Sequence, residues 1–127
     1  MTFFFDNCVS PAIPQVLGCL GVDTLHLRDR FPSNVKDEEW IREAGKHGWV
    51  IITEDGRIRK KRPEREALKE ADTVCLFLPK ALAGQNKWGQ VKWIVKHWQG
   101  IERHLGRAKP GQSFSVGHRS GGLELMV

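Results

Sequence analysis

Apolar and amphipathic segments alternate along the whole chain. Short apolar runs typical of strands occupy residues 2–6, 22–27, 49–53 and 73–78. Helices are expected to begin near Ser10, Asp37, Pro63 and Lys87. The run at residues 49–53 is apolar along its length, which favours a strand covered on both faces.

The longest expected helix, residues 87–105, carries one apolar face. Its members recur at helical spacing: Trp88, Val91, Ile94, Val95, Trp98 and Ile101. We expect Trp88 and Trp98 to pack in the core or in an interface. Trp93 lies off this face and is the tryptophan expected to be exposed, where it could stack against a nucleobase.

Four successive strand–helix units predict an α/β fold with a mainly parallel sheet and helices on both sides. Residues 113–116 and 123–127 flank a turn rich in Gly and Ser, which predicts a terminal strand pair or a strand with a loose end. No internal repeat or linker divides the sequence. We therefore expect a single domain spanning residues 1–127 and a central sheet of four to five strands.

The composition favours a soluble globular protein. Of its 127 residues, 40% are hydrophobic and 28% are charged, which argues against disorder. No apolar run approaches the roughly 20 residues that cross a bilayer, and no secretory signal is recognisable. The three cysteines lie far apart in apolar surroundings and are expected to be core thiols, so we expect a cytoplasmic protein.

The charge is distributed unevenly along the chain. Residues 1–56 hold nine acidic and five basic side chains, whereas residues 57–127 hold six acidic and fifteen basic ones. A chain divided in this way can place an acidic cluster beside a basic surface. This favours a polyanionic partner, nucleic acid first, although a merely solvated basic face would give the same pattern.

Three acids are expected at one edge of the sheet. Asp6 ends the first strand, Asp37 begins the helix after the second, and Asp55 follows the third. Loops after parallel strands emerge on the same side, so these carboxylates can converge. They would suit Mg²⁺ or Mn²⁺, which can activate water and neutralise charge on a phosphate. Each also has a simpler explanation, such as an N-cap at Asp37 or a turn at Asp55–Gly56.

Five short motifs in this order resemble the PIN-domain superfamily, in particular its compact PIN-like branch related to VapC toxins. They are residues 4–7 (FFDN), 10–11 (SP), 26–29 (HLRD), 37–40 (DEEW) and 50–55 (VIITED). The resemblance implies a three-layer α/β/α fold and a metal-dependent endoribonuclease that binds Mg²⁺ through Asp6, Asp37 and Asp55. It also implies a toxin that acts as a homodimer and is controlled by an antitoxin protein.

The sequence departs from that family after Asp55. Relatives often carry a further acid two positions on, where this chain has Arg57. Glu38 or Glu54 could supply the extra carboxylate instead. The basic run that follows is expected to bind RNA phosphates, as a salt-dependent contact, through Arg57, Arg59, Lys60, Lys61 and Arg62.

Two other functions are compatible with the same pattern. Arg57 favours a PIN-like module whose metal site is impaired and which holds RNA or a partner protein without cleaving it. A phospho-acceptor receiver domain also places acids at strand ends, but it would need paired acids after the first strand, where Asp6 stands alone. Serine-hydrolase, P-loop and zinc motifs do not occur.

Overall fold

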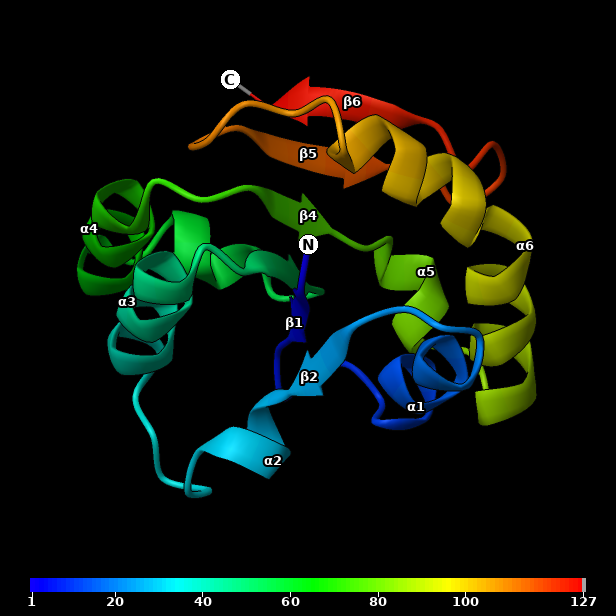
Figure 1. The fold of residues 1–127 in the computed structure, drawn as a ribbon, viewed down its shortest axis with the longest axis horizontal. Helices are drawn as coiled ribbons and strands as arrows, with labels where there is room; N and C mark the ends of the chain where they lie inside the picture. Colours follow the sequence, from blue (N-terminus) through cyan, green and yellow to red (C-terminus); the bar gives the residue numbers. More distant parts are fainter. Residues whose placement is uncertain (127) are drawn as a thin grey trace.

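A six-stranded sheet forms the centre of the protein in a computed structural model that describes residues 1–126. Its strands lie in the order β2-β1-β3-β4-β5-β6, and only β6 is antiparallel to its neighbour (Figure 1). The strands are β1 (Phe3–Phe5), β2 (Thr24–His26), β3 (Val50–Thr53), β4 (Cys75–Phe77), β5 (Ser113–Val116) and β6 (Leu123–Met126). The α/β class is as predicted, and the sheet has one strand more than expected because both C-terminal segments join it.

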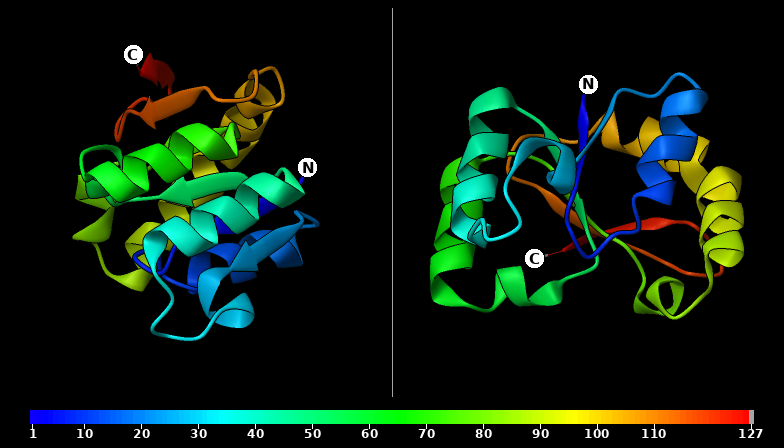
Figure 2. Two further views of the ribbon diagram at one scale, coloured as in Figure 1. Left: turned by 90° about the vertical axis from the view of Figure 1, so that its left-hand side faces the viewer. Right: turned by 90° about the horizontal axis from the view of Figure 1, so that it is seen from below.

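Helices cover both faces of the sheet, with α3 and α4 on one side and α1 and α6 on the other (Figures 1 and 2). The helical elements are α1 (Ala12–Cys19), α2 (Leu27–Arg30), α3 (Asp37–His47), the 3₁₀ helix η1 (Gly56–Arg59), α4 (Arg62–Ala71), α5 (Lys80–Ala83) and α6 (Lys87–Leu105). This arrangement confirms the three-layer α/β/α architecture. The short elements α2, η1 and α5 lie in segments whose sequences predict loops.

The aromatic strand β1 joins the two halves of the core. Phe3 and Phe5 face α6, where the Phe3 and Trp98 ring centroids lie 4.8 Å apart. Phe4 points to the opposite side and stacks on Trp49 at 5.3 Å. All three phenylalanines are buried, and each contributes about 1.5–3 kcal/mol by leaving water. The uninterrupted apolar sequence of β1 therefore follows from a sheet that is covered on both faces.

Helix α3 begins and ends where its sequence predicts. Its first turn carries three acids, Asp37, Glu38 and Glu39, which interact favourably with the positive end of the helix dipole. It ends at Gly48, whose φ of 66° is left-handed and suits glycine. These local signals determine where along the chain the helix that carries Asp37 begins and ends.

The cysteines are less uniformly buried than expected. Cys75 lies in the core on β4, whereas Cys8 and Cys19 are exposed residues. The prediction of three core thiols is therefore wrong for two of them, because each lies in a segment that leaves the sheet or ends a helix. Within residues 1–126, no helix combines the length and apolarity needed to cross a membrane.

Candidate functional site

Acidic side chains gather at the carboxyl ends of the first and third strands. Strand β1 pairs in parallel with β3, with Phe5 beside Ile52, so the next residues along, Asp6 and Thr53, are neighbours. The backbone N–H of Asp6 still donates to the carbonyl of Ile52 at 3.0 Å. The sheet itself therefore holds Asp6 in place at the edge where parallel α/β proteins bind their ligands.

Asp6 is the most enclosed carboxylate of this group, with a relative exposure of 5%. It accepts hydrogen bonds from the Asn7 backbone N–H at 2.6 Å and from the Thr53 hydroxyl at 2.8 Å. The Cys8 thiol donates a longer one at 3.4 Å. Burial nevertheless raises the pKa of Asp6 above its usual value, and the negative charge of Asp37 acts in the same direction.

Glu54 is the second carboxylate whose charge is disfavoured. Burial raises its pKa to about 7, and the nearby charge of Asp6 adds to the effect. Its Oε1 atom is buried and has no hydrogen-bond partner among residues 1–126. A buried carboxylate oxygen without a partner is costly, and a cation or a donor brought by a ligand would relieve that cost.

Asp37 lies at the start of α3, facing the same region. Its carboxylate accepts a hydrogen bond from the Trp40 indole N–H at 2.9 Å, so Trp40 fixes its orientation. The capping position of the helix belongs to Lys36, and Asp37 is the first helical residue. Its charge acts on both Asp6 and Arg57, which places Asp37 within electrostatic reach of both.

Asp55 is paired with a basic residue of the same loop. The Arg57 guanidinium donates to both carboxylate oxygens, at 2.9 Å through Nε and 3.1 Å through Nη2. The Arg57 backbone N–H adds a third bond at 2.9 Å and makes Asp55 the cap of η1. These hydrogen bonds, chiefly from the Arg57 side chain, hold the pKa of Asp55 below its usual value.

The predicted metal ligands therefore occupy two electrostatic environments. The negative charge of Asp6 is repelled by that of Asp37 and in turn disfavours the charge of Glu54. Asp55, in contrast, is neutralised by Arg57. Within residues 1–126, no three His, Cys, Asp or Glu side chains are gathered closely enough to hold a metal ion. The donors are nevertheless the oxygen ligands that Mg²⁺ and Mn²⁺ prefer, and the partnerless Glu54 oxygen fits a cation as its missing partner. Glu38 is half-buried and lies next to Asp37 in the first turn of α3.

The predicted RNA-binding residues lie next to this cluster and differ in their surroundings. Arg57 is paired with Asp55, and the Arg59 guanidinium lies over the Phe77 ring at 5.8 Å. Arg62 contacts Glu66 at 3.2 Å one turn along α4. Lys60 and Lys61 are exposed, and the charge of Lys61 helps to lower the pKa of Asp55. The basic run thus borders the site, with part of its charge engaged within the chain.

Two residues at the site were not singled out from the sequence. Thr53 donates to Asp6 and also accepts the Asp55 backbone N–H at 3.0 Å, so it links the two acids. Its position as the last residue of the otherwise apolar strand β3, beside Asp6, was a usable signal. Cys8 is an exposed residue as a whole, but its thiol lies between Asp6 and the Glu54 backbone N–H, and partial burial of the thiol raises its pKa to about 12. No sequence pattern pointed to Cys8.

Comparison with protein families finds a match in the N-terminal part of the chain. A family model described as a PIN like domain matches residues 1–80, which include β1 to β4 and every acid discussed above. Comparisons with curated proteins and with solved structures returned no match.

Proposed function

Because the chain belongs to the PIN-like domain family, whose members typically have a nuclease fold, we propose that it is a metal-dependent endoribonuclease. The proposed reaction is hydrolysis of RNA phosphodiester bonds. The observation that supports it best is the group of carboxylates coupled to Asp6 at the carboxyl edge of a parallel sheet, since the charge of Asp37 raises the pKa of Asp6 and that of Asp6 raises the pKa of Glu54. Such a group is unfavourable by itself and suits a bound cation.

The divalent cation would be held by Asp6, Asp37 and Asp55, with Glu54 as an additional carboxylate. When bound, Mg²⁺ or Mn²⁺ supplies an activated water and neutralises the charge that develops on the phosphate. Thr53 and Asn7 keep the Asp6 carboxylate oriented, and Trp40 does the same for Asp37. Asp55 can join only after its bidentate pair with Arg57 opens, and Arg57 is then available to a phosphate oxygen.

Replacement of Asp6 tests this activity. Asp6→Asn keeps the shape of the side chain and removes its charge, so we expect cleavage of a labelled single-stranded RNA in Mg²⁺ or Mn²⁺ to fall at least about a hundredfold. The matched control is Glu70→Gln, which neutralises an exposed acid of α4 and should cleave at the wild-type rate. Equal turnover by wild type and Asp6→Asn would exclude the mechanism.

A second function is favoured by one specific contact. Arg57 neutralises Asp55 with a bidentate ion pair where relatives often carry an acid, so the chain could be a module that binds RNA without cleaving it. In that case wild-type protein would bind labelled RNA in EDTA, and added Mn²⁺ would produce neither cleavage nor heat in a calorimetric titration. Cleavage that requires Mn²⁺ and Asp6 would exclude this alternative.

The biological setting is also a proposal and rests on the family resemblance alone. In it the protein is the toxin of a toxin–antitoxin pair, a homodimer in the cytoplasm, with RNA as substrate and an antitoxin protein as inhibitor. Growth arrest on expression of wild type, and none with Asp6→Asn, would support the toxin role.

A further inference from the structure

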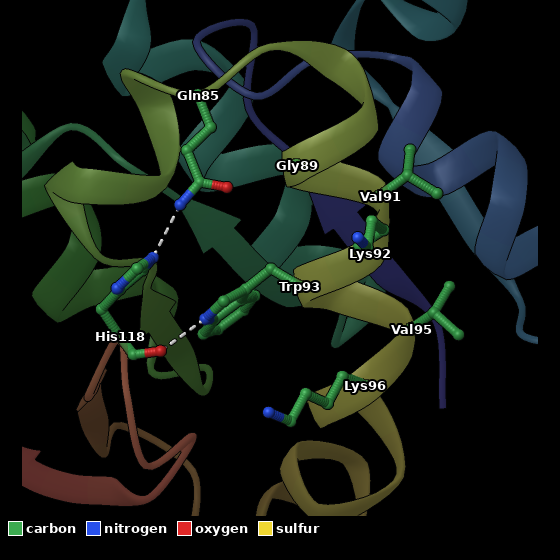
Figure 3. Close-up of a pocket in the computed structure, with 8 residues that line it drawn as sticks. All are labelled: Gln85, Gly89, Val91, Lys92, Trp93, Val95, Lys96 and His118. Carbon is green, nitrogen blue, oxygen red and sulfur yellow. Dashed lines mark hydrogen bonds between the residues drawn. The ribbon is translucent and has the colours of Figure 1, made fainter.

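The outer surface of α6 carries exposed apolar side chains beside lysines. Trp88 is 80% exposed and Val95 45% exposed, both unusually high for their size. A shallow groove of about 660 Å³ runs along α6, with Val91 and Val95 on one side and Lys92 and Lys96 pointing across its front (Figure 3). Trp88 does not line this groove but lies one helical turn before Lys92 on the same helix. This surface lies outside the acidic cluster and has no role in the proposed cleavage.

The loop after β5 forms the far wall of the groove. His118 accepts a hydrogen bond from the Trp93 indole N–H at its carbonyl oxygen, 2.7 Å away, and its ring lies 2.8 Å from the Gln85 amide nitrogen. Trp93 is 7% exposed and stacks in parallel with the His118 ring. The expectation that Trp93 is exposed is therefore wrong, because this loop covers it. Trp88 lies outside the core, and its packing in an interface stays a prediction.

The charge around the groove is of one sign. No acidic residue occurs from residue 73 to residue 101, a segment that contains Lys80, Lys87, Lys92 and Lys96. Lys92 and Lys96 lie one helical turn apart, about 6 Å along the axis. The pKa of His97 is lowered first by burial and then by the charges of Lys96 and His118. An occupant with negative charge would offset this repulsion.

From this surface we infer a second RNA-binding site, in which Trp88 stacks on a base while Lys92 and Lys96 contact phosphates. The inference rests on the proposed action on RNA. An exposed indole beside regularly spaced lysines is the combination that single-stranded nucleic acids favour. A second copy of this chain would bring lysine against lysine. Strands β1 and β4 both run parallel to β3, so the chain leaves β4 toward α5 and α6 at the same edge of the sheet at which Asp6 follows β1.

RNA binding measured in EDTA tests this site separately from cleavage, because EDTA removes the divalent cation that the proposed cleavage requires. The probe is a fluorescein-labelled 12-nucleotide oligo(U), followed by anisotropy at several salt concentrations. We expect Trp88→Leu to weaken binding about tenfold, because leucine keeps the apolar contact and cannot stack, while Trp88→Phe retains most of the affinity. Lys92→Gln combined with Lys96→Gln should reduce the slope of log affinity against log salt by about 1.4, the value for two phosphate contacts.

A lysine far from the groove serves as the control for the double lysine variant. Lys46→Gln removes an exposed charge on α3, on the other face of the sheet, and should leave both affinity and slope unchanged. Wild-type affinity in Trp88→Leu and in the double lysine variant would overturn the inference. The inference would also be overturned if the protein bound an acidic amphipathic peptide tightly and RNA did not displace that peptide. In that case α6 would be a protein-binding surface. Asp6→Asn should bind normally; if it also cleaves normally, the nuclease proposal fails while the α6 site stands.

Discussion

At the scale of single residues, the carboxylates of the site differ because their neighbours shift their pKa values in opposite directions. Asp6 and Glu54 lie partly out of water and close to other acids, which raises the pKa of each. Asp55, two positions from Thr53, has the opposite shift because Arg57 binds it. Sequence alone could not separate these cases, because the shifts depend on burial and on which side chains meet.

The stability of the metal-free protein should depend on pH through Glu54. Its pKa is about 7 when folded and near 4.5 when unfolded, so the folded state binds more protons between these values. The stability that protonation of Glu54 gives to the folded state is therefore fully present below pH 4.5 and is lost as the pH rises through 7. Because Glu54 is only half-buried, we expect Glu54→Gln to raise the free energy of unfolding at pH 8 by about 1 kcal/mol, well below the full value of the shift.

Urea denaturation in EDTA at pH 4 and pH 8 measures this difference. At pH 4 wild type and Glu54→Gln should have nearly equal stability. Glu124→Gln, an exposed acid on β6, should show no such dependence on pH. A stability gain from Glu54→Gln that is as large at pH 4 as at pH 8 would show that packing, rather than charge, is responsible.

At the scale of elements, the contact between α3 and α4 fixes the helix that carries Asp37. Gly45 of α3 faces Ala71 at the end of α4, and a Cβ added at Gly45 would lie 2.7 Å from the Ala71 Cα. Non-bonded carbon atoms do not come this close, so the two helices can pack at this distance only with glycine at position 45. The same helix has its first acid at Asp37, which means that this packing also positions the site.

Gly45→Ala is therefore expected to destabilise the protein by about 2 kcal/mol through overpacking. Gly100→Ala on α6 is the matched control, since it also replaces a helical glycine but meets no atom within 4 Å. It should stabilise the protein by about 0.5–1 kcal/mol through helix propensity. Chemical denaturation of both variants tests this, and a stabilised Gly45→Ala would mean that α3 and α4 are farther apart than described.

At the scale of the whole molecule, three distant chain segments build one site. Asp6 follows β1, Asp37 begins α3, and Glu54 and Asp55 follow β3. The basic rim comes from η1 and the start of α4, and α6 lies on the other face of the sheet. Parallel pairing of β1 with β3 brings the first and third of these segments together, because their carboxyl ends then lie at the same edge.

The Arg57–Asp55 pair should compete with a metal ion for the same carboxylate. Arg57→Gln releases Asp55 and removes a positive charge near Asp37, so we expect Mn²⁺ affinity measured by calorimetry to rise about tenfold. The control Arg62→Gln breaks an exposed pair with Glu66 on α4 and should leave the affinity unchanged. Weaker Mn²⁺ binding in Arg57→Gln would contradict this competition.

The order of elements could be predicted from sequence because it depends on local patterns. The apolar runs became β1 to β4, and the signals at Asp37, Pro63 and Lys87 each lie at the start of a helix. The acids at the strand ends could be expected at one edge for the same reason, since parallel topology follows from alternating strands and helices. The exposure of Trp88 and Trp93 could not be predicted, because it depends on the distant loop that carries His118.

The sequence by itself thus determined the α/β class, the positions of most elements and the edge at which the acids lie. These properties follow from hydrophobic periodicity and chain connectivity, which are local. Only the tertiary structure decided that Arg57 engages Asp55, that Glu54 joins Asp6, and that Trp88 rather than Trp93 faces solvent. Each of these depends on burial and on contacts through space, because a side chain's charge and exposure are set by neighbours far away in the chain.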